Sequence, residues 1–290
     1  ADLRPQVTAR APGVLVGLQT AHPWMATPTF KALSGHFVLG AGDTHNLRTA
    51  SIDEIVSEMA RPETKALLMA ELEQSGQALA FISLARVFPL DDEMDYEPEA
   101  DQSVAARAER EGRDPFDLLY DLMLEGGGRR FFFAPIYNYA EYNNDVVRTM
   151  LTHERGVFGL GDAGAHCGAI CDASMPTFML THWGRDRHRG EQLPLEFLVK
   201  KISNDTASLY GLHDRGRVAP GMKADLNVID FNRLRVNPPE LAYDLPADGR
   251  RLLQRAEGYV ATIVSGTVIM RDGHDTGARP GELIRGSRSA

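Results

Sequence analysis

The pattern of hydrophobic residues changes near residue 214, and this change divides the chain into two predicted parts. Before it, apolar residues recur at helical spacing or form short runs next to glycine, which is typical of an α/β region. After it come strand-length segments separated by glycines, at Ala224 to Asp230, Tyr259 to Ser265 and Thr267 to Arg271. We therefore predict an α/β region over 1–214 and a small all-β domain over 215–290.

Helix-start signals predict several helices in the first part. Ser51 followed by Glu54 forms an S-x-x-E capping box, and Pro62 suits the first turn of the next helix. Asp114 is a suitable N-cap for a helix that begins at Pro115 and ends before a run of three glycines. The remaining predictions are helices over about 104–111, 141–151 and 194–203 and another from about Met175, an extended run over 14–18, a buried strand over 78–84, and a strand or loop start over 131–136.

Charge and composition exclude several kinds of partner. The net charge is −9, whereas nucleic-acid binding requires a basic face. The one dense basic stretch, Arg185 to Arg189, is expected to be a solvated loop. No run approaches the roughly 18 apolar residues of a membrane span, and the start lacks the pattern of a signal peptide. Cys167 and Cys171 do not form a C-x-x-C motif or a disulfide framework, so we expect a cytoplasmic protein.

A glycine-flanked carboxylate after a short apolar strand is the main candidate for catalysis. The strand is predicted over Val157 to Leu160, and Gly-Asp-Ala-Gly-Ala-His follows it. Strand ends of this kind open onto the active-site face of α/β barrels. Asp162 could therefore be catalytic, or it could cap the next segment through its side-chain oxygen, and the local pattern leaves both open.

The other reactive side chains allow weaker interpretations. His166 could bind substrate, ligate a metal or be a hydrogen-bonded loop histidine. Cys167 could be a soft ligand or a nucleophile, although a buried inert thiol is the favoured interpretation, and His182 is expected to pack in a helix. His36 and His45 have no zinc-binding spacing, and the common nucleotide, serine-hydrolase and metalloprotease motifs are lacking. The residues alone thus predict an α/β domain with one candidate catalytic aspartate and a small β domain.

Three segments resemble one enzyme superfamily. GRVAPGMKADLNVID, at 216–230, resembles the segment by which amidohydrolases pass from a TIM barrel to a small β-sandwich. VFGLGDAGAH, at 157–166, resembles their last barrel strand, which ends in an aspartate matched here by Asp162. VSGTVIMRDGHDTGARPG, at 264–281, resembles the tail of N-acyl-D-amino-acid deacylases, and this narrows the resemblance to that family.

The resemblance implies a specific architecture and cofactor. Residues 1–214 would be the C-terminal part of a metal-dependent-hydrolase TIM barrel, with a long insertion over about 30–139 between the seventh and eighth strands. Residues 215–290 would be the small β-sandwich. The complete enzyme would bind Zn²⁺ mostly through ligands on strands that this chain lacks. Asp162 would act as general base toward zinc-bound water and could also touch the metal, while His166 would contact substrate.

Three functional interpretations follow from the resemblance. The first is hydrolysis of a linear amide such as an N-acyl-D-amino acid, and the second is hydrolysis of a cyclic amide, as in hydantoinases and dihydroorotases. The third is a non-catalytic half-barrel that pairs with a partner chain or with a second copy, because exposed strand edges need cover. Deacylases of this family commonly carry H-P-R after the catalytic aspartate, whereas 172–178 here is DASMPTF, so an arginine that binds the substrate carboxylate is not expected there.

Overall fold

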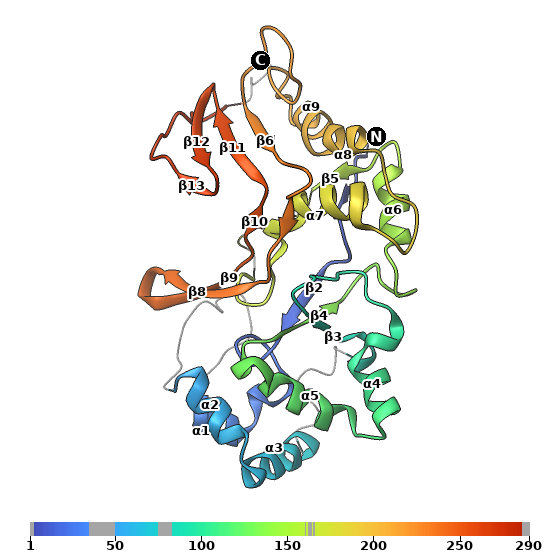
Figure 1. Cartoon of the computed structure of the whole chain (residues 1–290), viewed down its shortest axis with the longest axis vertical. Coiled ribbons are helices and arrows are strands. Elements are labelled where there is room, and N and C mark those ends of the chain that lie inside the picture. Colours follow the sequence, from blue (N-terminus) through green and yellow to red (C-terminus); the bar gives the residue numbers. More distant parts are fainter. Residues whose placement is uncertain are drawn as a thin grey trace.

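The structure, a computed structural model, describes residues 3–34, 50–74, 83–159, 161, 164 and 166–285. Figure 1 shows helices α1–α5 gathered on one side of a small sheet, helices α6–α9 near the N-terminus, and the C-terminal strands beside them. The described residues thus form a mixed α/β fold. They do not form a closed barrel, and β1–β5 is the only parallel pair among their named strands.

The parallel pair joins the start of the chain to a strand far along the sequence. In β1 (Gln6–Val7) and β5 (Val157–Phe158), Gln6 lies opposite Val157 and Val7 opposite Phe158. The Gly159 N–H donates to the Val7 carbonyl at 3.0 Å and continues the ladder. The carboxyl ends of both strands therefore lie at one edge. The predicted strand over 157–160 ends earlier, at Phe158, and Leu160 lies outside the described residues.

A three-stranded antiparallel sheet separates two hydrophobic cores. Its order is β2 (Gly13–Val16), β4 (Phe131–Pro135) and β3 (Phe88–Leu90). Phe131 and Phe133 of β4 face one core, while Phe132 and Ala134 face the other, because alternate residues of a strand point to opposite faces. Both faces are covered, so the sequence of β4 is continuously apolar and every residue is buried.

On one side of this sheet, four helices begin where the sequence predicts, and a fifth, at Pro28–Ser34, lies in a segment for which no helix was predicted. Ser51 and Glu54 form the reciprocal hydrogen bonds of a capping box, and the Asp114 carboxylate accepts from the Phe116 and Asp117 N–H groups at 2.8 and 3.0 Å. Of the strand predicted over 78–84, residues 78–82 lie outside the described residues and Leu84 begins a 3₁₀ turn. The helices are α1 (Pro28–Ser34), α2 (Ile52–Met59), α3 (Pro62–Gln74), α4 (Val104–Glu111) and α5 (Pro115–Leu124).

The helices on the other side pack against the continuation of β1. Trp183 is fully buried, and its indole N–H donates to the Ala9 carbonyl at 2.7 Å. Two of these helices pass into π-helical turns, at His182–Asp186 and Lys201–Asp205. The elements are α6 (Asp145–Thr152), which begins later than predicted, α7 (Met175–Thr181), α8 (Leu195–Lys200) and α9 (Thr206–Leu209).

Between residues 215 and 285, which the structure describes, the regular elements are strands and one 3₁₀ turn. The largest sheet has the order β13–β12–β11–β6, and its strands β6 (Leu226–Ile229), β11 (Tyr259–Val264) and β12 (Thr267–Arg271) lie where the sequence predicts strands. The others are β7 (Arg235–Val236), β8 (Glu240–Leu245), β9 (Gly249–Leu253), β10 (Ala256–Glu257) and β13 (His274–Asp275). The division near residue 214, the sandwich and the numbering of barrel strands stay predictions. None of the helices in the described ranges is long and apolar enough to cross a membrane.

Candidate active site

The carboxyl edge of β1 and β5 is the candidate site. Residues 8–11 leave this edge after β1, and the chain from Gly159 onward leaves it after β5. Asp162, predicted as the catalytic residue and as a metal contact, lies outside the described residues, so both roles stay predictions. Its neighbours Gly161 and Gly164 are described, and Gly164 has a φ of 124°, a backbone conformation that favours glycine.

His166, the predicted substrate contact, is exposed. Its φ of 47° is left-handed, and its carbonyl accepts the Ala169 and Ile170 N–H groups at 2.8 and 2.9 Å. These bonds close a turn that begins at His166. The imidazole therefore points from a well-defined turn without being buried, and its contact with substrate stays a prediction.

Two distant strands bind the segment that follows His166. The Leu15 N–H of β2 donates to the Ala169 carbonyl at 2.8 Å. The Leu252 N–H of β9 donates to the Cys167 carbonyl at 2.6 Å. We call residues 166–174 the α7 connection, because they lead into α7. The connection is thus hydrogen-bonded both to the three-stranded sheet β2–β4–β3 and to the C-terminal strand β9.

A buried ion pair joins the α7 connection to the residues after β1. Arg10 is 2% exposed, and its Nη2 lies 2.9 Å from Asp172 Oδ1 and 3.3 Å from the Cys171 carbonyl oxygen. Its Nη1 donates to Ser174 Oγ at 3.3 Å, and its guanidinium lies 3.9 Å from the centre of the Tyr96 ring. Sequence reasoning missed this pair, because Arg10 and Asp172 are 162 positions apart and neither belongs to a recognisable motif.

The Tyr96 ring packs against the Arg10 guanidinium of this ion pair. The side-chain Nε2 of Gln254 donates to the Tyr96 hydroxyl at 2.9 Å, and the side-chain Oε1 of Gln254 accepts from Ser174 Oγ at 2.5 Å. Burial raises the pKa of Tyr96 to about 12, although the nearby Arg10 opposes the shift. The phenol therefore stays neutral near pH 7 and links the loop that contains Tyr96 to the C-terminal strands.

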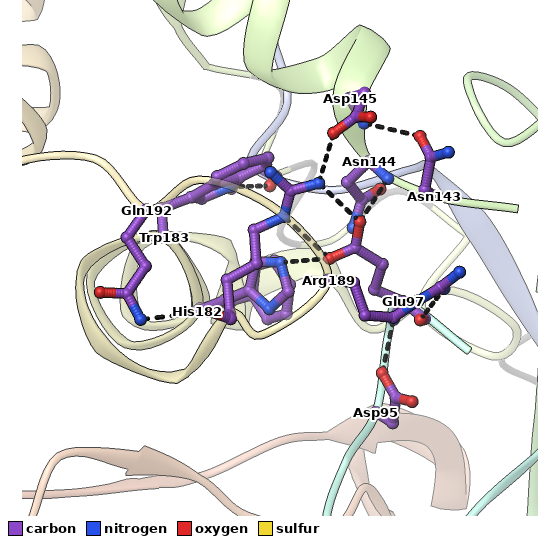
Figure 2. Close-up of polar contacts among 12 residues, drawn as sticks. Asp95, Glu97, Asn143, Asn144, Asp145, His182, Trp183, Arg189 and Gln192 are labelled. Atoms are coloured by element: carbon purple, nitrogen blue, oxygen red, sulfur yellow. Dashed lines mark hydrogen bonds and ion pairs between the residues drawn. The ribbon is translucent and has the colours of Figure 1, made fainter. Parts of the chain in front are cut away.

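A second buried cluster surrounds Glu97 (Figure 2). The Glu97 carboxylate lies 3.0 Å from His182 Nε2, accepts from Arg187 at 2.9 and 3.0 Å, and accepts the Asn144 N–H at 2.6 Å. Burial alone would raise its pKa, but these donors outweigh burial and lower the pKa to about 2. Arg187 also donates to Asp145 at 2.6 Å, so the cluster ties the start of α6 to the turn after α7.

This cluster corrects one expectation and supports another. Arg185 to Arg189 is not a solvated loop, because the Arg187 side chain is fully buried and bonded to Glu97. His182 does pack as expected, stacked on Phe178 with ring centres 4.5 Å apart. The sequence holds no local signal for the buried arginine, since Glu97 lies 90 positions away.

A cavity of about 230 Å³ lies between the loop around Tyr96, α7 and β7. Apolar side chains and charges of both signs share its wall, so it has no strong preference for one ligand charge. Its lining includes Met94, Tyr96, Phe178, His182, Arg189 and Val236.

The described residues do not fit a zinc site. No group of three or more His, Cys, Asp or Glu side chains able to hold a metal occurs within the described ranges. The oxygens of Glu97 are occupied by its nitrogen partners, and His36 and His45 lie outside the described residues.

The two cysteines are expected to react at very different rates. Cys171 is 7% exposed, and burial raises the pKa of its thiol to about 12, which leaves little thiolate for reaction. Cys167 is partly exposed and not the buried thiol that was favoured from the sequence. Of these two cysteines, we expect only Cys167 to react with iodoacetamide in the native protein at pH 8 and both to react after denaturation, as read from the masses of the peptides that contain them. Cys167→Ser should abolish the native labelling, and rapid labelling of Cys171 would contradict the prediction.

Comparison with known proteins then assigns the family. The sequence pattern of the Amidohydrolase family matches residues 68–270, which is more than half of the chain. The chain belongs to the amidohydrolase family. Members of this family are hydrolases and are typically metal-dependent, which agrees with the superfamily resemblance of the three sequence segments.

Individual relatives match only in part. A dihydroorotase from Methanothermobacter thermautotrophicus is 34% identical over 86 residues, which cover 28% of this chain and 19% of that protein. Two solved structures of D-aminoacylase, one from a study of its binuclear metal centre, share 22% identity with this chain, with TM-scores of 0.38 and 0.39. They cover 67% of this amidohydrolase and 37% of D-aminoacylase. The chain therefore spans about a fifth of the dihydroorotase and under two fifths of D-aminoacylase.

Proposed function

We propose that the protein containing this chain hydrolyses a linear amide, an N-acyl-D-amino acid or a related compound. One observation carries the proposal: within an amidohydrolase, the parallel strands β1 and β5 end at one edge, and Asp162 follows β5 by four residues. Barrel enzymes use residues at this edge for chemistry. The deacylase-like tail at 264–281 favours a linear amide over a cyclic one.

Asp162 is proposed as the general acid–base. Its carboxylate would take a proton from the attacking water and deliver one to the leaving amine, so that the C–N bond breaks without expelling an amide anion. His166, exposed four residues further on, is proposed to contact the substrate. We propose Zn²⁺ as the metal of the complete enzyme, with ligands beyond the described residues, and Asp162 could also touch it.

A cyclic amide is the second candidate substrate. The partial match to a dihydroorotase favours it, and so does the DASMPTF segment, which lacks an arginine for the carboxylate of an N-acyl amino acid. Both candidates undergo hydrolysis of an amide C–N bond. They differ in whether the products separate or stay joined in one opened ring.

A substrate panel tests the proposal. The full-length protein, purified with its natural partners or second copy in place, is assayed with N-acetyl-D-amino acids, N-acetyl-L-amino acids, a hydantoin and dihydroorotate. We expect the highest kcat/KM for an N-acetyl-D-amino acid, with loss of activity after chelation and recovery with Zn²⁺. Turnover of dihydroorotate or the hydantoin alone would establish the cyclic-amide alternative. Inactivity toward every amide would overturn the proposal and favour a non-catalytic subunit.

A further inference from the structure

We infer that Arg10 is the positioning residue of the candidate site: it holds the α7 connection, residues 166–174, against the end of β1. The inference rests on the proposed function only insofar as it concerns Asp162, which precedes the connection by four residues. Arg10 is buried and is not proposed to touch substrate. Its effect on chemistry would be exerted through the backbone that it binds.

The contacts of Arg10 converge on one short segment. Its two terminal nitrogens bind Cys171, Asp172 and Ser174, three of the last four residues before α7. A planar guanidinium can serve a carboxylate, a carbonyl and a hydroxyl in fixed directions, whereas a lysine ammonium cannot reproduce that fork.

Neighbouring side chains fix the guanidinium itself. It lies over the Tyr96 ring at 3.9 Å, with the Phe178 ring 5.3 Å away, so an aromatic face supports the cation. The Ala9 N–H contacts the Met175 sulfur at 3.4 Å, and the Ala9 carbonyl accepts from Trp183. The residue before Arg10 is therefore also bound to the α7 segment, and Arg10 has little freedom to follow a moving connection.

Arg10 lies next to the strand pair that ends at the candidate site. Arg10 follows β1 by three residues, and β1 is paired in register with β5. Asp172, which follows β5 in the sequence, binds Arg10, and Arg10 follows the strand that pairs with β5. Together with the bonds from Leu15 and Leu252, Arg10 limits the positions that the α7 connection can adopt.

Hydrogen–deuterium exchange of the full-length protein tests this role directly. We expect Arg10→Met to raise the exchange rate of amides in 166–174 by about tenfold or more, with β11 and β12 unchanged, because the opening is local. If Arg10→Met does not fold, Arg10→Met with Asp172→Asn removes both charges of the pair and is measured in its place. Arg10→Lys should restore part of the protection, since it keeps the charge and loses the fork.

Steady-state kinetics supply the functional readout. With an amide that the wild type hydrolyses, Arg10→Met is expected to lower kcat by about 100-fold and to change KM by less than about threefold, because misplacement of a catalytic group costs rate rather than binding. Arg10→Lys should lie between the two proteins. A loss in KM alone would overturn the positioning role.

Arg187→Met is the matched control, because Arg187 is an equally buried arginine in an ion pair. It should lower thermal stability as Arg10→Met does, yet leave exchange in 166–174 within about twofold of wild type. Equal loosening of 166–174 by both variants, or by neither, would overturn the inference. Failure of the wild type to hydrolyse any amide would overturn the proposed function instead, and exchange would still decide the role of Arg10.

Discussion

Replacing Asp162 with asparagine in the full-length protein is expected to lower kcat by about three orders of magnitude, because general acid–base catalysis contributes about 10²–10⁴-fold. Asparagine keeps the size of the side chain, but it replaces one acceptor oxygen with an NH₂ donor and does not accept a proton near pH 7. KM should change little if the group acts on the proton and not on substrate binding. Initial rates at saturating amide concentration measure the effect.

Asp272→Asn is the matched control for this experiment. Asp272 is an exposed turn residue with a φ of 48°, a conformation that asparagine tolerates, and it lies in the C-terminal β region. Its substitution should leave kcat within about twofold of wild type, as most surface changes do. If Asp162→Asn retained activity within about tenfold of wild type, Asp162 could not be the general acid–base.

Replacing Glu97 with glutamine is expected to lower the free energy of unfolding by about 3–5 kcal/mol, the usual cost of leaving one partner of a buried ion pair behind. The Arg187 side chain is fully buried, and the Glu97 carboxylate also binds the Asn144 N–H and lies beside His182. Glutamine offers one acceptor oxygen and directs an NH₂ group at these donors. Urea denaturation at pH 7, monitored by circular dichroism, measures the loss.

An exposed ion pair tests whether burial is the reason for the large loss of stability expected from Glu97→Gln. Glu257→Gln removes the partner of Arg235 at the surface and should shift the urea midpoint too little to resolve, because solvent screens such pairs. A similar shift for both variants would mean that the Glu97 cluster is no more than a surface ion pair.

The low pKa of Glu97 also predicts how stability depends on pH. Its pKa is near 4.5 in the unfolded chain and about 2 in the folded one, so its contribution is fully present above pH 4.5 and is lost as pH falls toward 2. The shift corresponds to about 3 kcal/mol. Wild type should therefore lose more stability than Glu97→Gln between pH 4.5 and pH 2, and parallel pH profiles would contradict the assigned pKa.

Local signals predicted where helices α2 to α5 begin, but they did not predict α1. The capping box at Ser51 and the N-cap at Asp114 act within a few residues of the helix that they start, so the sequence contains the whole cause. The segment over 131–136 could not be decided between strand and loop. β4 is apolar along its whole length because sheet faces on both sides are buried, and no local pattern reports the two cores that cover it.

The interactions that shape the candidate site could not be predicted in the same way. Arg10 meets Asp172, and Glu97 meets Arg187, only after the chain has folded across 162 and 90 positions. A charged residue in a sequence normally indicates solvent exposure, because burial of a charge is tolerated only with a partner. The strand-end pattern and the resemblance to amidohydrolases both identified Asp162 as a candidate, yet neither could identify the arginine that holds residues 166–174.

The three-stranded sheet β2–β4–β3 restricts how the sequence of such a chain can change in evolution. In β4, Phe132 belongs to the core of helices α1–α5, whereas Phe133 belongs to the core that underlies the candidate site. Helices α1–α5 therefore cannot be exchanged for other helices without changes in β4. A lineage that replaced these helices would also have to rebuild every second residue of β4 while preserving the others, so recombination at this point should be rarer than gradual substitution within each layer.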